Sequence, residues 1–278
     1  VTWLISVTGN PAAPAWYVPS RQEEGYGLNA EALSALAAQG TSLVVTVDCG
    51  ITGVAEAKHA RDLGLDLIIT DHHNFAAELP AADVLVHPRL PNTAYPFGGL
   101  CGAGVAFKLA WAIATRASGA SRVTPRLREA LLRAVGLAAF GTVTDVMPLI
   151  DENRLLVKHG LENLRTRGGP GLARLIEITG LGEQSRLESE HIAFKLGPRL
   201  NAAGRMATAA NGIELLVTDD STRGAQLADY LHELNAQRET EERSLQLAAA
   251  KQAKECFSPE ADAALVLADR GWHKGVIG

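Results

Sequence analysis

The chain has 278 residues, of which 47% are apolar and 21% are charged, a composition typical of a folded globular protein with one large domain and part of another. No apolar run reaches membrane-spanning length and no secretory signal opens the sequence, so no membrane association is expected, and the three scattered cysteines favour a reducing, cytoplasmic setting over a disulfide framework. The formal net charge of −5 excludes a protein-wide attraction to nucleic acid, so any such contact requires a local basic surface backed by metal ions.

The sequence first predicts a short strand and a helix. Residues 16–19 have the composition of a short strand that leads into a polar loop containing Arg21. A helix is expected next, with Asn29 as its N-cap and Gly40 at its end, because Asn accepts hydrogen bonds from helix N-termini and Gly readily adopts the left-handed conformation that ends helices.

Three short apolar runs then predict a parallel sheet. Residues 43–47 and 67–70 are rich in β-branched side chains and bounded by turn residues, and residues 84–86 form a similar run. The segment between the first two, residues 54–63, suits a crossover helix, which makes the strands it joins parallel. The expected fold class is therefore α/β, with a parallel sheet flanked by helices.

The pattern becomes helical after this sheet. Residues 105–137 predict a helical appendage, and from residue 222 apolar side chains recur at helical spacing over a segment long enough to connect two lobes. Residues 264–268 predict the first strand of a second α/β lobe. The expected domain division is an α/β domain over residues 1–221, a long connecting helix over 222–257 and the truncated start of a second lobe over 258–278.

A group of carboxylates and imidazoles follows two neighbouring strands. Asp48 comes directly after the first buried strand, and Asp71-His72-His73 comes directly after the second. Because the carboxyl ends of parallel strands meet at one edge of a sheet, these side chains are expected to lie close together. Oxygen and imidazole ligands are typical of hydrolytic manganese, magnesium or zinc centres, so the sequence predicts a metal site. Since successive strand residues point in opposite directions, His72 and His73 are expected to differ in role.

Two further stretches carry weaker signals. Asp145 is a third acidic candidate, although an Asp in a turn before Pro is common. Residues Arg199, Asn201 and Arg205 lie among small side chains, which suits phosphate recognition because guanidinium groups match phosphate oxygens. Composition alone supports equally well a solvated loop whose arginines pair with glutamates.

In their order along the chain, these motifs resemble those of the DHH phosphoesterases. Within that family they most resemble the bacterial RecJ single-strand-specific 5′→3′ exonucleases, from about Trp16 onward. Asp-His-His alone is a short motif, but the ordered series is specific. The matching stretches are Val47-Asp48-Cys49-Gly50, Asp71-His72-His73, residues 141–149, residues 194–205 and residues 272–278.

The resemblance implies an enzyme with a two-metal centre, usually of Mn²⁺ with Mg²⁺ as the alternative, that hydrolyses single-stranded DNA in repair and recombination. By position, Asp48 would bridge the two ions, and His72 and Asp145 would complete one of them. His73 would lie beside the scissile phosphate, and Asp71 would orient an imidazole. The residues implied to hold DNA phosphates are Arg21, Arg199, Asn201 and Arg205.

Part of the family pattern is missing from this sequence. The family's first motif is an Asp-x-Asp strand end before residue 19, but residues 1–15 contain no acid. The Gly-Gly-His signature of the second lobe, of the DHHA1 type, would lie beyond Gly278. We therefore expect a fragment that holds at most one ion and is inactive alone, and we assign the activity to the full-length protein.

Two alternative functions stay open. The first is another DHH enzyme that acts on pyrophosphate, polyphosphate or short oligonucleotides, whose site would be similar but whose substrate is small. The second is a non-catalytic scaffold that binds replication partners; such proteins lose ligands, whereas five candidate site residues are present here. For the exonuclease, single-stranded DNA is the expected partner, with a helicase and a single-strand-binding protein as candidate protein partners.

Overall fold

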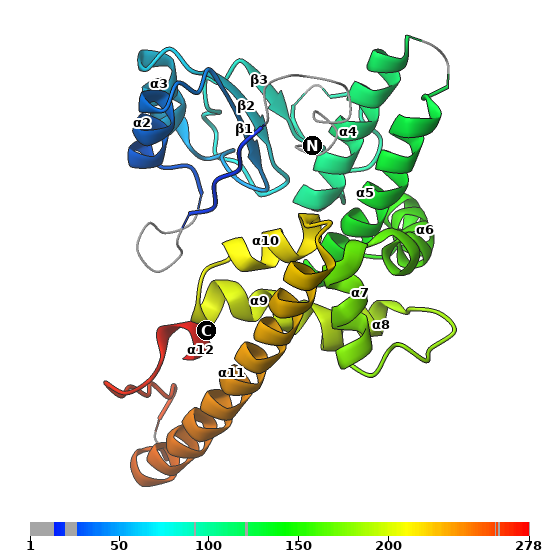
Figure 1. The fold of residues 1–278 in the computed structure, drawn as a ribbon. Helices are drawn as coiled ribbons and strands as arrows, with labels where there is room; N and C mark the ends of the chain where they lie inside the picture. The colour runs from blue at the N-terminus through cyan, green and yellow to red at the C-terminus, as the bar shows by residue number, and fades with distance from the viewer. Residues whose placement is uncertain are drawn as a thin grey trace.

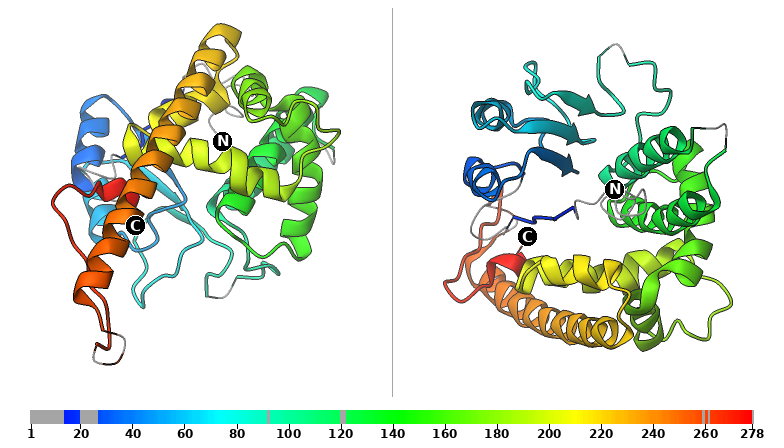
Figure 2. Two further views of the ribbon diagram at one scale, coloured as in Figure 1. Left: turned by 90° about the horizontal axis from the view of Figure 1, so that it is seen from below. Right: turned by 45° about the horizontal axis from the view of Figure 1, so that its top comes forward.

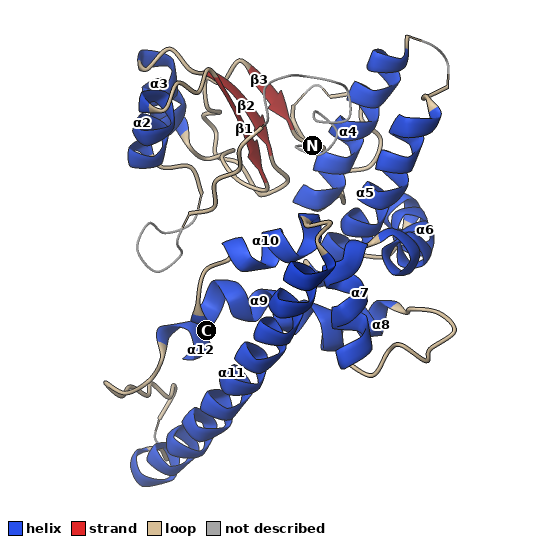
Figure 3. Cartoon of the chain, viewed as in Figure 1, coloured by secondary structure: helices blue, strands red, loops and turns tan. Residues whose placement is uncertain are grey.

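The strands that the structure describes form one parallel sheet (Figures 1 and 3). The structure is a computed structural model and describes residues 14–19, 27–91, 93–119, 122–258, 260 and 262–277. The strands are β1 (Leu43–Val47), β2 (Asp66–Thr70) and β3 (Val84–Val86), paired in the order β1-β2-β3. Both pairs are parallel, which confirms the predicted α/β fold class.

Helices cover both faces of this sheet (Figures 1 and 2). On one face lie α2 (Ala30–Ala38), whose N-cap Asn29 accepts a hydrogen bond from the amide of Ala32 at 2.7 Å, and α3 (Val54–Asp62). The helix α4 (Gly102–Ser118) lies on the other face. The apolar sides of α2, α3 and the strands share one buried core, made of Leu33, Ala57, Ala60, Leu65, Leu67 and Ile69.

A helical lobe follows the sheet, as the sequence predicts. Its main core is formed mostly by leucines and alanines of residues 140–234, with Phe140, Ile176 and Ile192. A second core joins α4 to the next helix along the chain. A π-helix, η1, leads without a break into α9. The elements are α5 (Pro125–Thr144), α6 (Asp151–Arg167), α7 (Gly169–Ile178), α8 (Ser189–His191), η1 (Ile192–Leu196), α9 (Gly197–Met206) and α10 (Ala210–Val217).

The long helix α11 (Ser221–Cys256) has 36 residues, which corresponds to a length of about 54 Å. Its N-cap Asp220 accepts hydrogen bonds from the amides of Thr222 and Arg223. The buried residues of α11 all lie in its first half, where it packs on α7, α9 and α10. A short helix, α12 (Lys274–Ile277), contacts α9 and α11 near the carboxyl terminus (Figure 1). The division into three domain segments stays a prediction.

Three local predictions are wrong. Residues 16–19 and 264–268 form no strand: Trp16, Tyr17 and Val266 are exposed, and neither segment pairs with any strand that the structure describes. Without a ladder partner, β propensity alone does not make a strand. The stretch 199–205 is helical rather than a loop, because it continues the helix that begins upstream. Across the part of the chain that the structure covers, no helix combines the length and apolarity needed to cross a bilayer.

Candidate metal centre

The chain leaves β1 through a left-handed turn at Asp48. This residue has φ of +66°, a conformation that Asp tolerates better than most side chains. The hydroxyl of Thr46 donates to the carbonyl of Cys49 at 2.7 Å, which holds the turn closed. The carboxylate of Asp48 lies against the first residue of α4, Gly102, where a β-carbon would come within 2.1 Å of Oδ1. Only glycine at position 102 leaves room for Asp48 in this place.

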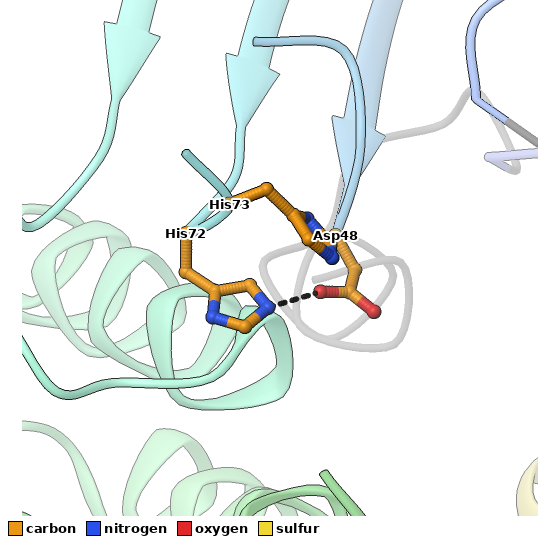
Figure 4. Close-up of side chains that lie close together, drawn as sticks. All are labelled: Asp48, His72 and His73. Atoms are coloured by element: carbon orange, nitrogen blue, oxygen red, sulfur yellow. Dashed lines mark ion pairs between the residues drawn. The ribbon is translucent and has the colours of Figure 1, made fainter. Parts of the chain in front are cut away.

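The imidazole of His72 reaches two carboxylates. Its Nε2 lies 3.1 Å from Oδ1 of Asp48 (Figure 4) and 3.5 Å from Oδ2 of Asp145. The His72 side chain is buried, and neither contact gives Nε2 a hydrogen bond of good geometry. A buried nitrogen facing two carboxylate oxygens fits a divalent cation, which accepts lone pairs from all three groups at once.

Asp145 comes from the far side of the site, at the C-cap of α5. The next residue, Val146, has φ of +54°; its amide donates to Val143 O and that of Met147 to Thr142 O, both at 3.1 Å. This is the hydrogen-bond pattern of a Schellman motif, which fixes the direction in which the chain leaves the helix. The position of Asp145 is therefore set by the end of α5.

The carboxylate of Asp71 is buried and holds the backbone and the ring of its neighbours. It accepts hydrogen bonds from the amides of Ile51, His72 and His73 at 3.0, 2.7 and 3.2 Å, and from Nδ1 of His73 at 2.7 Å. Burial alone would raise the pKa of Asp71, but these hydrogen bonds outweigh it and lower the pKa below its usual range. An ionised Asp71 keeps the proton of His73 on Nδ1 and leaves Nε2 as the ligand atom.

The two imidazoles lie together rather than pointing apart. Their ring centroids are 4.4 Å apart, and the ligand atoms of Asp48, His72 and His73 all lie within 4.8 Å of one another (Figure 4). The expectation of opposite directions is wrong because β2 ends at Thr70, so the alternation of a strand no longer applies. The separate roles of the two histidines stay a prediction, since both rings can reach one ion.

The site favours positive charge. The pKa of His72 is raised, chiefly by the adjacent Asp48 carboxylate, and burial raises the pKa of Asp145. Both groups therefore hold a proton more tightly than isolated side chains do, His72 because carboxylates lie beside it and Asp145 chiefly because burial disfavours its charged form. A divalent cation supplies the same positive charge and would take the place of those protons.

A cleft of about 380 Å³ lies between the carboxylates of Asp48 and Asp145 and the helix α9. Asp48 and Asp145 line it together with Asn201 and Arg205 of α9, so the structure brings these four predicted residues together. It does not bring Arg199 there: its Nε donates to His232 Nδ1 on α11 at 3.0 Å. Arg21 lies outside the described residues. The lining is completed by Cys101, Gly102, Ala103, Gly141, Thr144, Leu200, Gly204 and Ala209.

The sequence motifs of this site match those of a known protein family. Residues 4–138 match the DHH family, N-terminal domain. Residues 4–138 therefore carry the N-terminal domain of the DHH family. Its Asp71-His72-His73 stretch is the Asp-His-His motif that the sequence resemblance rests on.

Several relatives of this chain are RecJ proteins. It is 41% identical over 263 residues to the single-stranded-DNA-specific exonuclease RecJ of Bacillus subtilis, which covers 95% of this chain and 31% of that protein. It is 38% identical over 272 residues to the RecJ exonuclease of Escherichia coli, covering 95% of this chain and 46% of that protein. The chain therefore spans less than half the length of these curated relatives.

Solved structures show the same likeness. A crystal structure of exonuclease RecJ bound to manganese matches with a TM-score of 0.82 and 36% identity, over 99% of this chain and 65% of that one. The structure of RecJ from Thermus thermophilus in complex with Mn²⁺ matches with a TM-score of 0.75 and 37% identity, over 90% of this chain and 35% of that one.

Three residues around the DHH motif were missed by sequence reasoning. His87 and Arg89 follow β3: Nε2 of His87 donates to the carbonyl of His73 at 2.9 Å, and Arg89 Nη2 donates to the carbonyl of His72 at 2.5 Å. The rule that pointed to the ends of β1 and β2 applies equally to β3 and would have found them. No sequence motif marks Gly102, because its contact with Asp48 depends on tertiary structure.

Proposed function

We propose that the full-length protein is an exonuclease specific for single-stranded DNA, which hydrolyses phosphodiester bonds in the 5′→3′ direction with Mn²⁺ or, as an alternative, Mg²⁺. The observation that carries this proposal is the single cleft in which Asp48 and Asp145 face Asn201 and Arg205. Groups that suit metal ions and groups that suit phosphate thus line one space, as hydrolysis of a phosphodiester requires.

Each group has a distinct part in this function. Asp48, His72 and Asp145 would hold the metal, and bound divalent ions would polarise the phosphate and lower the pKa of a water molecule. Asp71 holds the ring of His73 through Nδ1, and the ring lies beside Asp48 and His72. Arg205 would bind a phosphate oxygen and fix the register of the strand.

Two features favour a polymeric substrate over pyrophosphate or a short oligonucleotide. The helix α9 lines the cleft over more than one turn, from Leu200 to Arg205, which suits contact with an extended strand. The relatives named above are single-stranded-DNA-specific exonucleases. The presence of Asp48, Asp71, His72, His73 and Asp145 favours an enzyme over a scaffold. Helicase and single-strand-binding protein partners, and the cytoplasmic location, stay predictions from the sequence.

The decisive experiment uses the full-length protein with oligonucleotides labelled at the 5′ or the 3′ end. We expect Mn²⁺-dependent release of the 5′ label from single strands, little release from a blunt duplex, and no activity in the Asp48→Asn variant. Pyrophosphate and short oligonucleotides are tested in parallel. Hydrolysis of the small substrates without degradation of the long single strand would overturn the proposal.

A further inference from the structure

The segment that precedes the carboxyl terminus touches the phosphate-facing side of the cleft. The helix α12 packs against α9 although some 70 residues separate them in sequence. Nη1 of Arg205 donates a hydrogen bond to the carbonyl of Gly275 at 3.1 Å. The same Arg205 lines the cleft that contains Asp48 and Asp145. One residue of α12 thus contacts the side chain of a cleft residue.

Gly275 also contacts the backbone of Arg205. A β-carbon at position 275 would lie 2.3 Å from the carbonyl oxygen of Arg205 and 3.1 Å from its carbonyl carbon. The opposing atoms are backbone, which cannot rotate away as the end of a side chain can. Arg205 lies in the last turn of α9, so its carbonyl is among those that a helix leaves without an internal partner. Only glycine at position 275 permits this approach.

The turn before α12 places Gly275. Its amide donates to Nδ1 of His273 at 3.1 Å, and the amides of Val276 and Ile277 donate to the carbonyl of His273. These bonds make residues 273–277 one compact unit. Arg205 is therefore contacted at both its backbone and its guanidinium by a preorganised segment.

From this double contact we infer that Gly275 is a positioning residue for Arg205, and that α12 holds the guanidinium in the direction from which it meets a phosphate of the substrate. The inference rests on the proposed function for the identity of that substrate. A guanidinium carries five N–H donors in one plane, so a bond from Nη1 to a fixed carbonyl sets the orientation of that plane. Holding it before the substrate arrives lowers the entropic cost of forming the phosphate contact.

A positioning role and a packing role for Gly275 predict different effects on DNA binding. A glycine that only lets α12 pack would affect stability, and its replacement would change DNA binding equally whether or not Arg205 is present. A positioning residue acts through Arg205 alone. Its effect on DNA binding must vanish once the guanidinium is removed.

The test compares Gly275→Ala with Gly182→Ala in the full-length protein. Gly182 is a matched control because a β-carbon there would meet nothing closer than 3.8 Å and its φ is ordinary. We expect Gly275→Ala to weaken single-stranded DNA binding about tenfold, the size of one charge-assisted hydrogen bond. The log-log salt slope should fall by about 0.7 as one phosphate contact is lost. Mn²⁺ affinity, measured by calorimetry, should be unchanged in both variants.

Two further measurements make the result decisive. In an Arg205→Ala background, Gly275→Ala should cause no additional loss of DNA affinity; an equal loss in both backgrounds would overturn the inference. If Gly275→Ala does not fold, His273→Ala loosens α12 without adding atoms. It should also weaken single-stranded DNA binding, but by a smaller factor. An unchanged salt slope in that variant would likewise overturn it.

Failure of the inference is separable from failure of the proposed function. Amide hydrogen exchange at the end of α9, measured without DNA, should increase in Gly275→Ala and not in Gly182→Ala. If the wild-type protein does not bind single-stranded DNA, the proposed function fails whatever the exchange shows. If it does bind and Gly275→Ala binds equally well, only the positioning role of Gly275 is lost.

Discussion

The carboxylate of Asp71 accepts a hydrogen bond from Nδ1 of His73 at 2.7 Å while the amide of Ile51 donates to the other oxygen at 3.0 Å. This bridge ties the ring of His73 to the loop after β1. The substitution Asp71→Asn keeps the shape but removes the charge that holds the proton on Nδ1. We expect turnover to fall about ten- to a hundredfold, the typical effect of removing the carboxylate that orients an imidazole at a metal site. Steady-state kinetics at saturating Mn²⁺ measure this, and near-normal turnover would show that His73 needs no such partner.

Asp71 also predicts how stability depends on pH. Its pKa is lowered in the folded protein, so its stabilising contribution is complete above the unfolded-state pKa, near 3.8, and is lost as pH falls through the lower folded value. The difference in unfolding free energy between wild type and Asp71→Asn should therefore be constant at neutral pH and shrink below about pH 4. Urea titrations in EDTA between pH 2 and 7 test this. A difference that grows on acidification would mean that the pKa of Asp71 is raised.

The close approach of Gly102 to Asp48 gives a sharper test of the site. Gly102→Ala would place a β-carbon 2.1 Å from Oδ1 of Asp48, which must then move. A displacement of about 1 Å at a reacting centre can lower activity by about a hundredfold. Gly104→Ala, in the same turn of α4, is the control, because its nearest neighbour is the flexible Leu100 side chain at 3.3 Å. Equal activities of the two variants would remove Gly102 from the site.

Excess Mn²⁺ is predicted to restore activity to a variant of Asp145 but not to a variant of Asp48. Asp48→Asn keeps a residue that tolerates positive φ, so the turn after β1 should survive. As a bridging ligand, Asp48 would serve both ions, and we expect its loss to lower activity at least about a thousandfold, or roughly 4 kcal/mol of transition-state stabilisation. Asp145→Asn should recover in part with added Mn²⁺ because it touches one ion. Rescue of Asp48→Asn by Mn²⁺ would contradict the bridging role.

Substitution of the two arginines of α9 should affect DNA binding differently. Arg205 lines the cleft, whereas Arg199 donates to His232 and to the carbonyl of Lys195. We expect Arg205→Ala to lower the salt slope of single-stranded DNA binding by about 0.7, the contribution of one phosphate contact. Arg199→Ala should leave the slope unchanged and lower thermal stability instead. A similar fall in slope for both variants would restore Arg199 to the phosphate-binding set.

The sequence predicted most closely those parts of the fold that depend on local pattern. The strands β1 and β2 and the N-cap at Asn29 follow from β-branched runs and from capping chemistry. The short range of these rules also explains the errors. Whether Trp16 or Val266 joins a strand depends on a distant partner, and the helical state of residues 199–205 depends on the helix that precedes them.

Part of the candidate site could also be predicted from the sequence. Strand ends identified Asp48, Asp71 and the two histidines, because the parallel topology brings them together without knowledge of packing. Which arginine of α9 faces the cleft could not be read from sequence, since Arg199 and Arg205 differ only in the side of the helix on which they lie. The close contacts of Gly102 and Gly275 are with atoms of distant segments, so their roles could not be predicted from the sequence.

The Schellman motif at the end of α5 has an unusual occupant. Its left-handed position normally holds Gly, but here it holds Val146, a residue that is 87% exposed and gains little from packing. A β-branched residue in this conformation costs about 1–2 kcal/mol. Val146→Gly should therefore raise the melting temperature, yet it would also loosen the chain beside Asp145. Engineering for heat resistance is thus expected to conflict with catalytic rate at this position, because the gain in stability lies one residue from the proposed metal ligand Asp145.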